Sequence, residues 1–261
     1  MRLLACVLAL VSLALEQTAA HAQSQNLEGV GVVLMHGKGG APGDFIAPAA
    51  QALQAAGAKV VMPQMPWARA RMYDAGYEQA MAEIDRAVAQ LKAQGASRIV
   101  VAGQSFGANA AIGYAARRGG VAAVVALAAG HTPERPFFAS HTASGVAKAK
   151  QLVADGKGDL PDSFPDINQG KTFNVRATAK VYLSYFDPGG PAVIPRNAAA
   201  MKTVPFLWVI GSDDSLVTAG ADYAFNKAPK HPKSKYLVVT AGHANTPDVA
   251  KAEVVAWLKS L

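Results

Sequence analysis

A serine, two aspartates and a histidine occur in an order that permits nucleophilic catalysis. Ser105 is the central residue of GQSFG, residues 103–107, and Asp213, Asp214 and His243 follow it along the chain. A serine hydroxyl is a weak nucleophile at neutral pH. It therefore needs a base within hydrogen-bond reach, and the base needs a carboxylate that fixes its tautomer. These residue types could together attack a carbonyl carbon and form a covalent acyl intermediate.

Each of these residues directly follows an apolar run that is typical of a strand. The runs are RIVVAG (98–103) before the serine, PFLWVIG (205–211) before the aspartates and KYLVVTA (235–241) before the histidine. Parallel strands present their carboxyl ends at one edge of a sheet, so we expect the three groups to meet there. The run after the serine is typical of a helix, and a strand, a sharp glycine-flanked turn and a helix together expose a nucleophilic serine.

Strand-like runs alternate with helical patterns along the chain. The three other runs are GVGVVLM (29–35), AKVVMP (58–63) and VAAVVALAAG (121–130). Continuous apolar runs are typical of strands that are covered on both faces. Residues 74–94 place apolar side chains on one helical stripe, and a last helix is expected to open with Thr246 as its cap before Pro247. The alternation predicts an α/β fold with a mostly parallel, doubly wound sheet of about six strands and helices on both faces.

The regular alternation stops between about residues 131 and 204. This segment contains an expected helix at about 144–155 and then a stretch rich in Gly, Pro and Asp. A segment of this length is too long for an ordinary connection between core strands. Because loops of open α/β sheets serve ligands at the carboxyl edge, we expect a lid or cap over that edge. A decorative insertion on a distant face is the alternative.

The strand ends, the GQSFG turn and the Ser, Asp, His order resemble the α/β-hydrolase family from about residue 29 to residue 261. The chain looks like an exported bacterial serine hydrolase or esterase with a minimal core and an inserted lid. The resemblance implies Ser105 as nucleophile and His243 as base. The acid of the family usually lies three residues past the glycine that ends its strand, which selects Asp214, with Asp213 as the alternative.

The resemblance also implies an oxyanion hole, made of two backbone N–H groups. One belongs to Phe106, directly after the nucleophile, and the other to the loop HGKGG, residues 36–40. We expect Lys38 to supply this second donor, with Gly39 as the alternative. Candidate substrate-binding residues around these groups are His36, Gly37, Gly39, Gln104 and Trp67.

The histidines divide into the base and several residues without an expected catalytic role. His36 is expected to brace its loop, whereas His131 and His141 lie at or near the lid with no assigned role. The spacing of the histidines does not match a metal site, so no metal is expected. We expect no cofactor either. Trp67 follows the second strand, where core packing is the alternative to lining a pocket.

The N-terminal segment resembles an export signal. Arg2 precedes an apolar run at residues 3–15, and small residues then form an A-x-A pattern that ends at Ala22. We expect residues 1–22 to be a cleaved signal peptide and residues 23–261 to form one periplasmic or secreted domain. A membrane anchor is the alternative, but the apolar run is too short to cross a bilayer. Stable membrane insertion is therefore not expected.

Composition excludes several kinds of chemistry. Cys6 is the single cysteine and lies within the expected signal peptide, so the mature chain would have no disulfides, no cysteine nucleophile and no thiolate metal site. The formal net charge is +7 at pH 7. The lysine-rich run KAPKHPKSK, residues 227–235, contains no aromatic residues and is expected to be a solvated loop, and nucleic-acid binding is not expected. The sequence leaves the oligomeric state open.

The favoured function is hydrolysis of a carboxylic ester with a small or medium acyl chain, through an acyl-enzyme intermediate. The expected partner is a small-molecule acyl substrate. The same triad also serves amides, thioesters and lactones, so an exported serine peptidase or amidase and an acyltransferase remain alternatives. An alternative of another class is a non-catalytic binding protein on a hydrolase fold, although such proteins usually lose the serine or the histidine.

Overall fold

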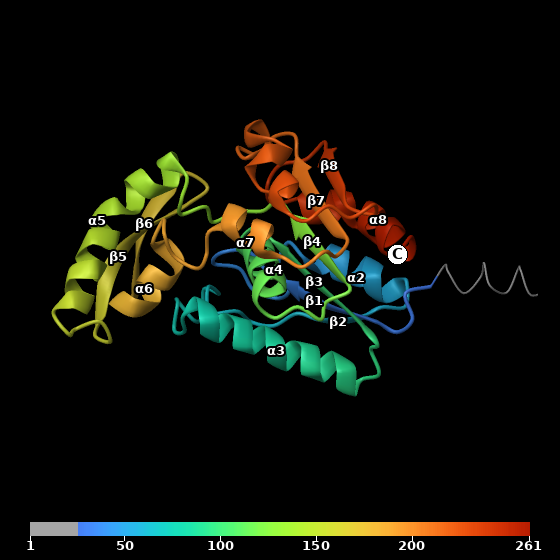
Figure 1. The fold of residues 1–261 in the computed structure, drawn as a ribbon, viewed down its shortest axis with the longest axis horizontal. Coiled ribbons are helices and arrows are strands. Elements are labelled where there is room, and N and C mark those ends of the chain that lie inside the picture. The colour runs from blue at the N-terminus through green and yellow to red at the C-terminus, as the bar shows by residue number, and fades with distance from the viewer. Residues whose placement is uncertain (1–25) are drawn as a thin grey trace, which may run out of the picture.

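Six parallel strands form the central sheet of the molecule, which is described here from a computed structural model over residues 26–261 (Figure 1). The strands are β1 (Val30–Met35), β2 (Lys59–Val61), β3 (Arg98–Gln104), β4 (Ala123–Leu127), β7 (Phe206–Gly211) and β8 (Lys235–Val239). Their spatial order is β2-β1-β3-β4-β7-β8, and every neighbouring pair is parallel. The predicted doubly wound sheet of about six strands is confirmed. The predicted signal peptide lies outside the described residues.

Helices cover both faces of this sheet. They are α2 (Ala47–Ala55) and α8 (Thr246–Lys259) on one face, and α3 (Tyr77–Ala93), α4 (Phe106–Arg117) and α7 (Ile194–Ala200) on the other. Successive strand residues point to opposite faces, so Val32 and Val100 pack with α2 and α8, while Val33 and Val101 pack with α3 and α4. This double burial explains why the strands are apolar at almost every position.

The last helix begins slightly differently from the prediction. Its N-cap is Asn245, and Thr246 is the first helical residue, with Pro247 in the first turn as expected. The Thr246 hydroxyl donates to the Gly242 carbonyl at 2.8 Å. It therefore holds the loop that precedes the helix rather than capping the helix.

The segment expected to form a lid divides into two parts. Residues 136–186 form a separate lobe, the insertion, at the left of Figure 1. It consists of α5 (Pro136–Ala154), β5 (Pro161–Asn168), β6 (Lys171–Thr178) and α6 (Ala179–Phe186). Helix α7 of the same segment packs instead against α4 in the core. The helix expected at about 144–155 was placed too late, because α5 already starts at Pro136, where a proline suits the first turn.

The antiparallel hairpin β5–β6 was not predicted. Strand β5 contains Pro161 and Pro165, residues that normally argue against a strand. They are tolerated here because each strand of a two-stranded sheet has a free edge. Gln169 (φ 48°) and Gly170 (φ 75°) form the left-handed, two-residue turn between the strands.

One buried side chain joins both ends of the insertion to the core. The Asn109 amide, on α4, donates from Nδ2 to the His131 carbonyl at 2.8 Å and to the Ala192 carbonyl at 2.7 Å. Its Oδ1 accepts from the Tyr77 hydroxyl at 2.9 Å. Because His131 precedes the insertion and Ala192 follows it, the chain leaves and rejoins the core at one point.

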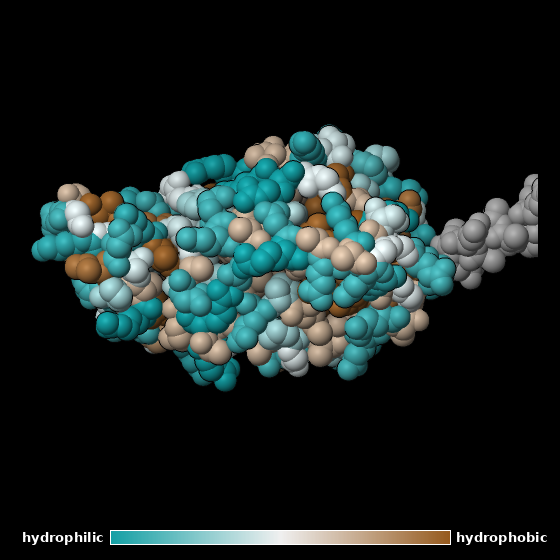
Figure 2. Space-filling model, turned by 90° about the horizontal axis from the view of Figure 1, so that it is seen from below, coloured by the Kyte–Doolittle hydropathy of each residue, from teal (hydrophilic) through white to brown (hydrophobic). Residues whose placement is uncertain are grey.

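The surface seen in Figure 2 is mostly hydrophilic, with scattered hydrophobic side chains both on the insertion and over the core. Phe137, Leu160 and Phe173 are among the exposed large hydrophobic residues of the insertion. The four lysines of residues 227–235 are exposed, as a solvated loop requires. This loop follows three short 3₁₀ turns, at Val217–Ala219, Ala221–Tyr223 and Phe225–Lys227. Within residues 26–261, no helix combines the length and apolar character needed to span a membrane.

Candidate active site

Ser105 lies in a strained turn between β3 and α4. Its backbone adopts φ 56° and ψ −115°, a conformation that a residue with a side chain rarely occupies. Two glycines make the turn possible. A Cβ on Gly107 would lie 2.2 Å from the Met35 carbonyl oxygen, and a Cβ on Gly103 would lie 2.2 Å from the Gly107 carbonyl carbon. The pentapeptide is therefore a tight strand-to-helix turn that presents the serine at the edge of the sheet.

His243 is held by Asp214. The Nδ1–H of His243 donates to Asp214 Oδ2 at 2.6 Å, and Asp214 Oδ1 accepts from the Leu216 N–H at 2.9 Å. The Asp214 residue is only 4% exposed. By contrast, the carboxylate of Asp213 is exposed and accepts from the Ser212 hydroxyl at 3.0 Å. The structure thus brings Asp214, and not Asp213, to the histidine and leaves His243 Nε2 free to act as a base.

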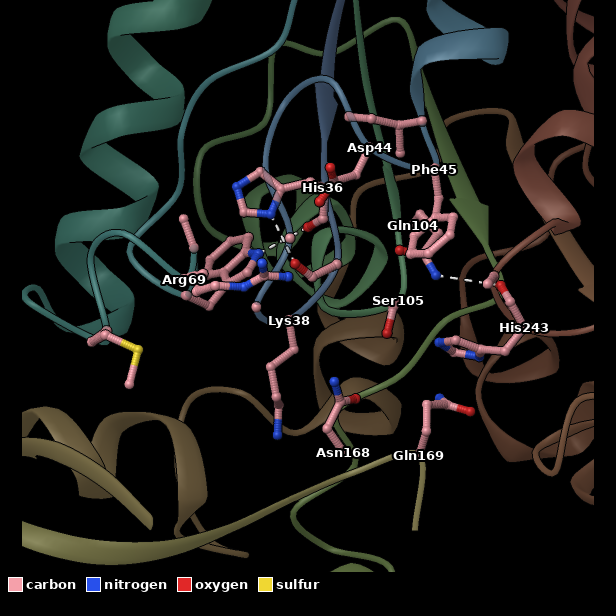
Figure 3. Close-up of a pocket in the computed structure, with 18 of the residues that line it drawn as sticks. His36, Lys38, Asp44, Phe45, Arg69, Gln104, Ser105, Asn168, Gln169 and His243 are labelled. Atoms are coloured by element: carbon pink, nitrogen blue, oxygen red, sulfur yellow. Dashed lines mark hydrogen bonds between the residues drawn. The ribbon is translucent and has the colours of Figure 1, made fainter. Parts of the chain in front are cut away.

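Ser105 and His243 face the same space at the carboxyl edge of the sheet (Figure 3). Gly130, after β4, lies beside both side chains. A Cβ at this position would lie 2.8 Å from Ser105 Oγ and 3.4 Å from His243 Cε1. No Ser105–His243 hydrogen bond is formed among the described residues, and such bonds commonly tighten only when substrate binds. A residue larger than glycine at position 130 would crowd the Ser105 hydroxyl.

The loop of residues 36–40 is braced by the chain that follows β2. His36 Nε2 accepts from the Met65 N–H at 3.1 Å, and His36 Nδ1 donates to the Gly37 carbonyl at 2.8 Å. Burial lowers the pKa of His36, which fits this neutral, bridging ring. The Trp67 indole N–H donates to the His36 carbonyl at 2.8 Å. His36 therefore supports the loop, as its position in the sequence suggested.

Hydrogen bonding distinguishes Lys38 from Gly39, the two alternative oxyanion donors of this loop. The Gly39 N–H donates to the Trp67 carbonyl at 2.8 Å and is occupied. Within residues 26–261, neither the Lys38 N–H nor the Phe106 N–H donates a hydrogen bond. The Trp67 ring stacks on the Phe106 ring with 4.6 Å between centroids. Lys38, rather than Gly39, thus has an available donor beside that of Phe106.

The candidate substrate-binding residues all line one cavity of about 560 Å³, which also contains Ser105 and His243. These residues are His36, Gly37, Gly39, Gln104 and Trp67. Gln104 has a second contact, because its Nε2 donates to the His243 carbonyl at 3.3 Å (Figure 3). A Cβ on Gly37 would lie 2.3 Å from Gln104 Oε1, so this glycine makes room for the glutamine.

A second cavity of about 610 Å³ is also lined by Ser105. Its walls include Arg135, Phe138 and Leu216, and it shares Asn168 and Gln169 with the first cavity. Sequence reasoning missed these two hairpin residues. The left-handed Gln169–Gly170 turn was the one signal that could have revealed the hairpin, but no local pattern indicates that it reaches the serine.

His131 lies against Phe106, the expected oxyanion donor. The two rings are nearly parallel, with 3.8 Å between centroids, and His131 Nε2 donates to the Tyr185 carbonyl at 2.8 Å. Burial, and secondarily the Lys38 cation, lower the pKa of His131 well below its usual range. The ring is therefore neutral and structural. His141 is exposed on α5 and its Nδ1 donates to the Phe137 carbonyl at 2.7 Å.

Comparison with known proteins identifies the family. The sequence profile of the alpha/beta hydrolase family matches residues 32–257. The chain is a member of the alpha/beta hydrolase family. No curated protein matches its sequence closely enough to count as a relative. In the part of the hydrolase that the structure describes, no group of three or more His, Cys, Asp or Glu residues could hold a metal ion.

Solved structures share the fold of this hydrolase at low sequence identity. One, from work on the metagenome-derived lipolytic enzymes LipS and LipT, is 18% identical with a TM-score of 0.62, covering 89% of this chain and 93% of its own. The monoacylglycerol lipase of Paleococcus ferrophilus is 20% identical with a TM-score of 0.59, covering 88% and 94%. Est1E from Butyrivibrio proteoclasticus, bound to ferulic acid, is 16% identical with a TM-score of 0.58, covering 88% and 86%.

Proposed function

We propose that this hydrolase cleaves carboxylic esters with small or medium acyl chains through an acyl-enzyme intermediate on Ser105. The observation that carries the proposal is the hydrogen bond of 2.6 Å between His243 Nδ1 and the buried Asp214 carboxylate, beside a serine in a strained turn. This arrangement leaves the other imidazole nitrogen available to take the serine proton.

The reaction would proceed in two halves. Ser105 Oγ attacks the acyl carbon while His243 Nε2 takes its proton, and the carbonyl oxygen becomes an oxyanion that accepts from two backbone N–H groups. When the tetrahedral intermediate collapses, the ester C–O bond breaks and His243 returns the proton to the leaving alcohol. Water then attacks the acyl-enzyme with His243 as base, which releases the acid and restores Ser105.

The available N–H groups of Lys38 and Phe106 are the oxyanion donors in this proposal. Two donors fixed in place before the reaction stabilise developing charge without reorganisation, and the loss of one such donor costs about 10²- to 10³-fold in kcat. Because both donors are backbone groups, proline is the one substitution that removes them, and its fixed φ would also change the backbone. Their position can otherwise be changed only through the residues that hold the backbone.

Two cavities and the structural neighbours support an ester as the substrate. Two cavities of about 560 and 610 Å³ meet at Ser105, which suits a small ester with one part on each side of the scissile bond. The structural neighbours include lipolytic enzymes and a monoacylglycerol lipase. Amidase, peptidase and acyltransferase activities would use the same residues and are outcomes of the tests below.

The first test is covalent labelling with a fluorophosphonate probe. The protein should be labelled, and Ser105→Ala should abolish the label, because only an activated serine attacks phosphorus at a useful rate. Labelling that persists in Ser105→Ala would show that another residue is the nucleophile. A protein that neither reacts with the probe nor hydrolyses any activated ester would favour the non-catalytic binding protein.

The two neighbouring aspartates provide a matched pair. Asp214→Asn should lower kcat by about 10⁴-fold, because the amide favours the wrong imidazole tautomer. Asp213→Asn should change kcat by less than about twofold, because that carboxylate is exposed and contacts only Ser212. Equal losses in the two variants would contradict the assignment of the acid.

A substrate panel tests the ester assignment. We expect turnover of p-nitrophenyl esters, highest for short and medium acyl chains, and little turnover of aminoacyl anilides. Strong anilide turnover without ester turnover would make the protein a peptidase or amidase. Product analysis with an added alcohol acceptor separates hydrolysis from acyl transfer.

We also propose that the hydrolase is exported with cleavage after residue 22. The proposal is supported by the Arg2, apolar run and A-x-A pattern of the sequence. Expression of the full chain in a bacterial host, followed by N-terminal sequencing of the periplasmic protein, should give Gln23 as the first residue. A full-length protein confined to the cytoplasm would contradict it.

A further inference from the structure

The side chain of Lys38 points away from Ser105 and into the insertion (Figure 3). Its Nζ donates to Asp166 Oδ1 at 2.5 Å and to the Ile167 carbonyl at 3.0 Å. The Lys38 side chain is 6% exposed and that of Asp166 is fully buried. The cation also lies 5.0 Å from the Phe138 ring centroid, on α5. The loop of residues 36–40, here called the oxyanion loop, is therefore tied to the insertion through the Lys38 side chain.

The Asp166 carboxylate holds a second neighbour of the same loop. Its Oδ1 also accepts from the Ile167 N–H at 2.6 Å, and its Oδ2 accepts from the Tyr73 hydroxyl at 3.2 Å. Burial raises the pKa of Tyr73 well above its usual range, so the hydroxyl remains a donor. Tyr73 belongs to the chain segment after β2, which also contains Trp67, and the Trp67 carbonyl accepts the Gly39 N–H. Asp166 thus supports the oxyanion loop directly and through this segment.

A buried ion pair of this kind is poorly explained by stability alone. Burying both charges removes them from water, and a well-packed apolar pair is often as stable or more stable. What the pair does provide is a fixed geometry: the ammonium has one carboxylate and one carbonyl to bind, and aromatic rings around it. Because the Lys38 side chain is anchored, its backbone N–H is held at one position.

We propose that Asp166 is a positioning residue that acts through Lys38 to hold the oxyanion-hole N–H in place. The proposal rests on the proposed function, since it assumes that the Lys38 N–H receives the oxyanion. It makes the insertion part of the catalytic apparatus as well as a wall of the pocket. Asp166 itself does not touch the reacting atoms.

The test compares two carboxylates of strand β5. Asp166→Asn should lower kcat for a p-nitrophenyl ester by about 10- to 100-fold, less than the complete loss of one oxyanion donor, while KM changes less than about threefold. The control is Asp162→Asn. Asp162 is on the same strand as Asp166 and forms an exposed ion pair with Lys148 of α5 at 2.7 Å. Loss of this ion pair should change kcat by less than about twofold.

The kcat values are taken per active site, titrated with the fluorophosphonate probe, so that partial unfolding does not lower them. A structural role alone would lower the melting temperature and leave this kcat unchanged. An Asp166→Asn enzyme with kcat within twofold of the wild type would therefore overturn the proposal. Inactivity of the wild type would instead contradict the proposed function.

A second variant covers the case in which Asp166→Asn does not fold. Lys38→Met leaves Asp166 with its two other donors, and the methionine can pack on the surrounding rings. Removal of the cation from the buried carboxylate strongly destabilises the fold, so activity is again taken per titrated active site. We expect the same 10- to 100-fold loss in kcat. The double variant should lose no more than the more impaired single variant, because both residues act through one contact. Losses that multiply would show independent roles and contradict the proposal.

Discussion

The strand ends and the insertion supply different parts of one site. Ser105, Asp214 and His243 follow β3, β7 and β8, so the sheet itself sets their positions. The insertion contributes Asn168 and Gln169 from the turn of a two-stranded hairpin. The strand ends are fixed by pairing on both sides within the central sheet and by close glycine contacts, whereas the hairpin turn closes a sheet of only two strands. The comparison suggests that changes at the strand ends affect folding and kcat. On the insertion, only the Asp166 contact with Lys38 is expected to affect kcat, and changes at residues that line the cavity should mainly affect selectivity.

Gly107→Ala should cause the largest loss of stability, because the strand ends have no room for an added side-chain atom. The new Cβ would lie 2.2 Å from the Met35 carbonyl oxygen, which is backbone and cannot move aside. We expect a loss of about 3 kcal/mol or more in the free energy of unfolding. This corresponds to a fall of roughly 6–12 °C in the melting temperature, measured by calorimetry.

Gly43→Ala is the matched control for this substitution. A Cβ at Gly43 would meet nothing within 4 Å, and its backbone is not left-handed. The melting temperature should therefore change by no more than about 2 °C. Similar losses at both glycines would contradict the view that the turn depends on backbone contact.

Asn109→Leu should separate the two regions. It leaves the buried carbonyls of His131 and Ala192 without their donor, whereas the Tyr77 hydroxyl keeps the Asn109 backbone carbonyl as an acceptor. We expect a loss of about 2–3 kcal/mol in the free energy of unfolding. Hydrogen exchange should show that amides of the insertion lose more protection than those of the sheet. A uniform loss would mean that the two regions unfold as one unit. Tyr77→Phe, which removes one of these bonds, should cost only about 1 kcal/mol.

The buried histidines predict a loss of stability in mild acid. Burial lowers the pKa of both His36 and His131, so below about pH 6.5 the unfolded chain binds protons that the folded chain does not. Stability should fall as pH decreases from 6.5 to 5, by up to about 1.4 kcal/mol per pH unit for each histidine. Melting temperatures measured across this range should show a shallower slope for His131→Phe. The same change at exposed His141 should leave the slope as it is in the wild type.

Substitutions of Phe45 and Phe173 should have the smallest effects on catalysis. The two residues line the same cavity but come from different regions, so they allow the core and the insertion to be compared. Phe45 comes from the core and is 59% exposed, and Phe173 comes from β6 and is 42% exposed. Replacing either with Ala should raise KM for longer acyl esters by about fivefold, equivalent to about 1 kcal/mol of lost apolar contact, with kcat nearly unchanged. If Phe173→Ala lowers kcat and leaves KM unchanged, the assignment of selectivity to this part of the insertion is wrong.

The sheet and the meeting of its polar strand ends could be predicted because both depend on local pattern. Apolar runs mark the strands, and parallel strands gather their carboxyl ends, so Ser105 and His243 were expected to lie together. The structure brings them together, and their catalytic roles remain predictions. Helix α5 was expected at about 144–155 but starts at Pro136, a position where proline is favoured. The hairpin was not predicted, because the prolines of β5 argue against a strand unless its edge is free.

Contacts between distant segments could not be predicted from the sequence. Lys38 and Asp166 are 128 residues apart, and no spacing rule links a lysine in a glycine-rich loop to an aspartate next to a proline. The choice between Lys38 and Gly39 as donor likewise depended on the Trp67 carbonyl, which only the fold places next to Gly39. Such pairings follow from the shape of the assembled chain.

Because Asn109 binds the chain just before and just after the insertion, the insertion could be exchanged as a unit. Its two ends lie next to each other, so recombination or deliberate grafting can replace the insertion without redirecting any strand of the sheet. If Asp166 positions Lys38 as we propose, a replacement would also need a carboxylate that reaches Lys38. Proteins of this type could then acquire new substrates by exchanging the insertion, while the residues at the strand ends stay the same.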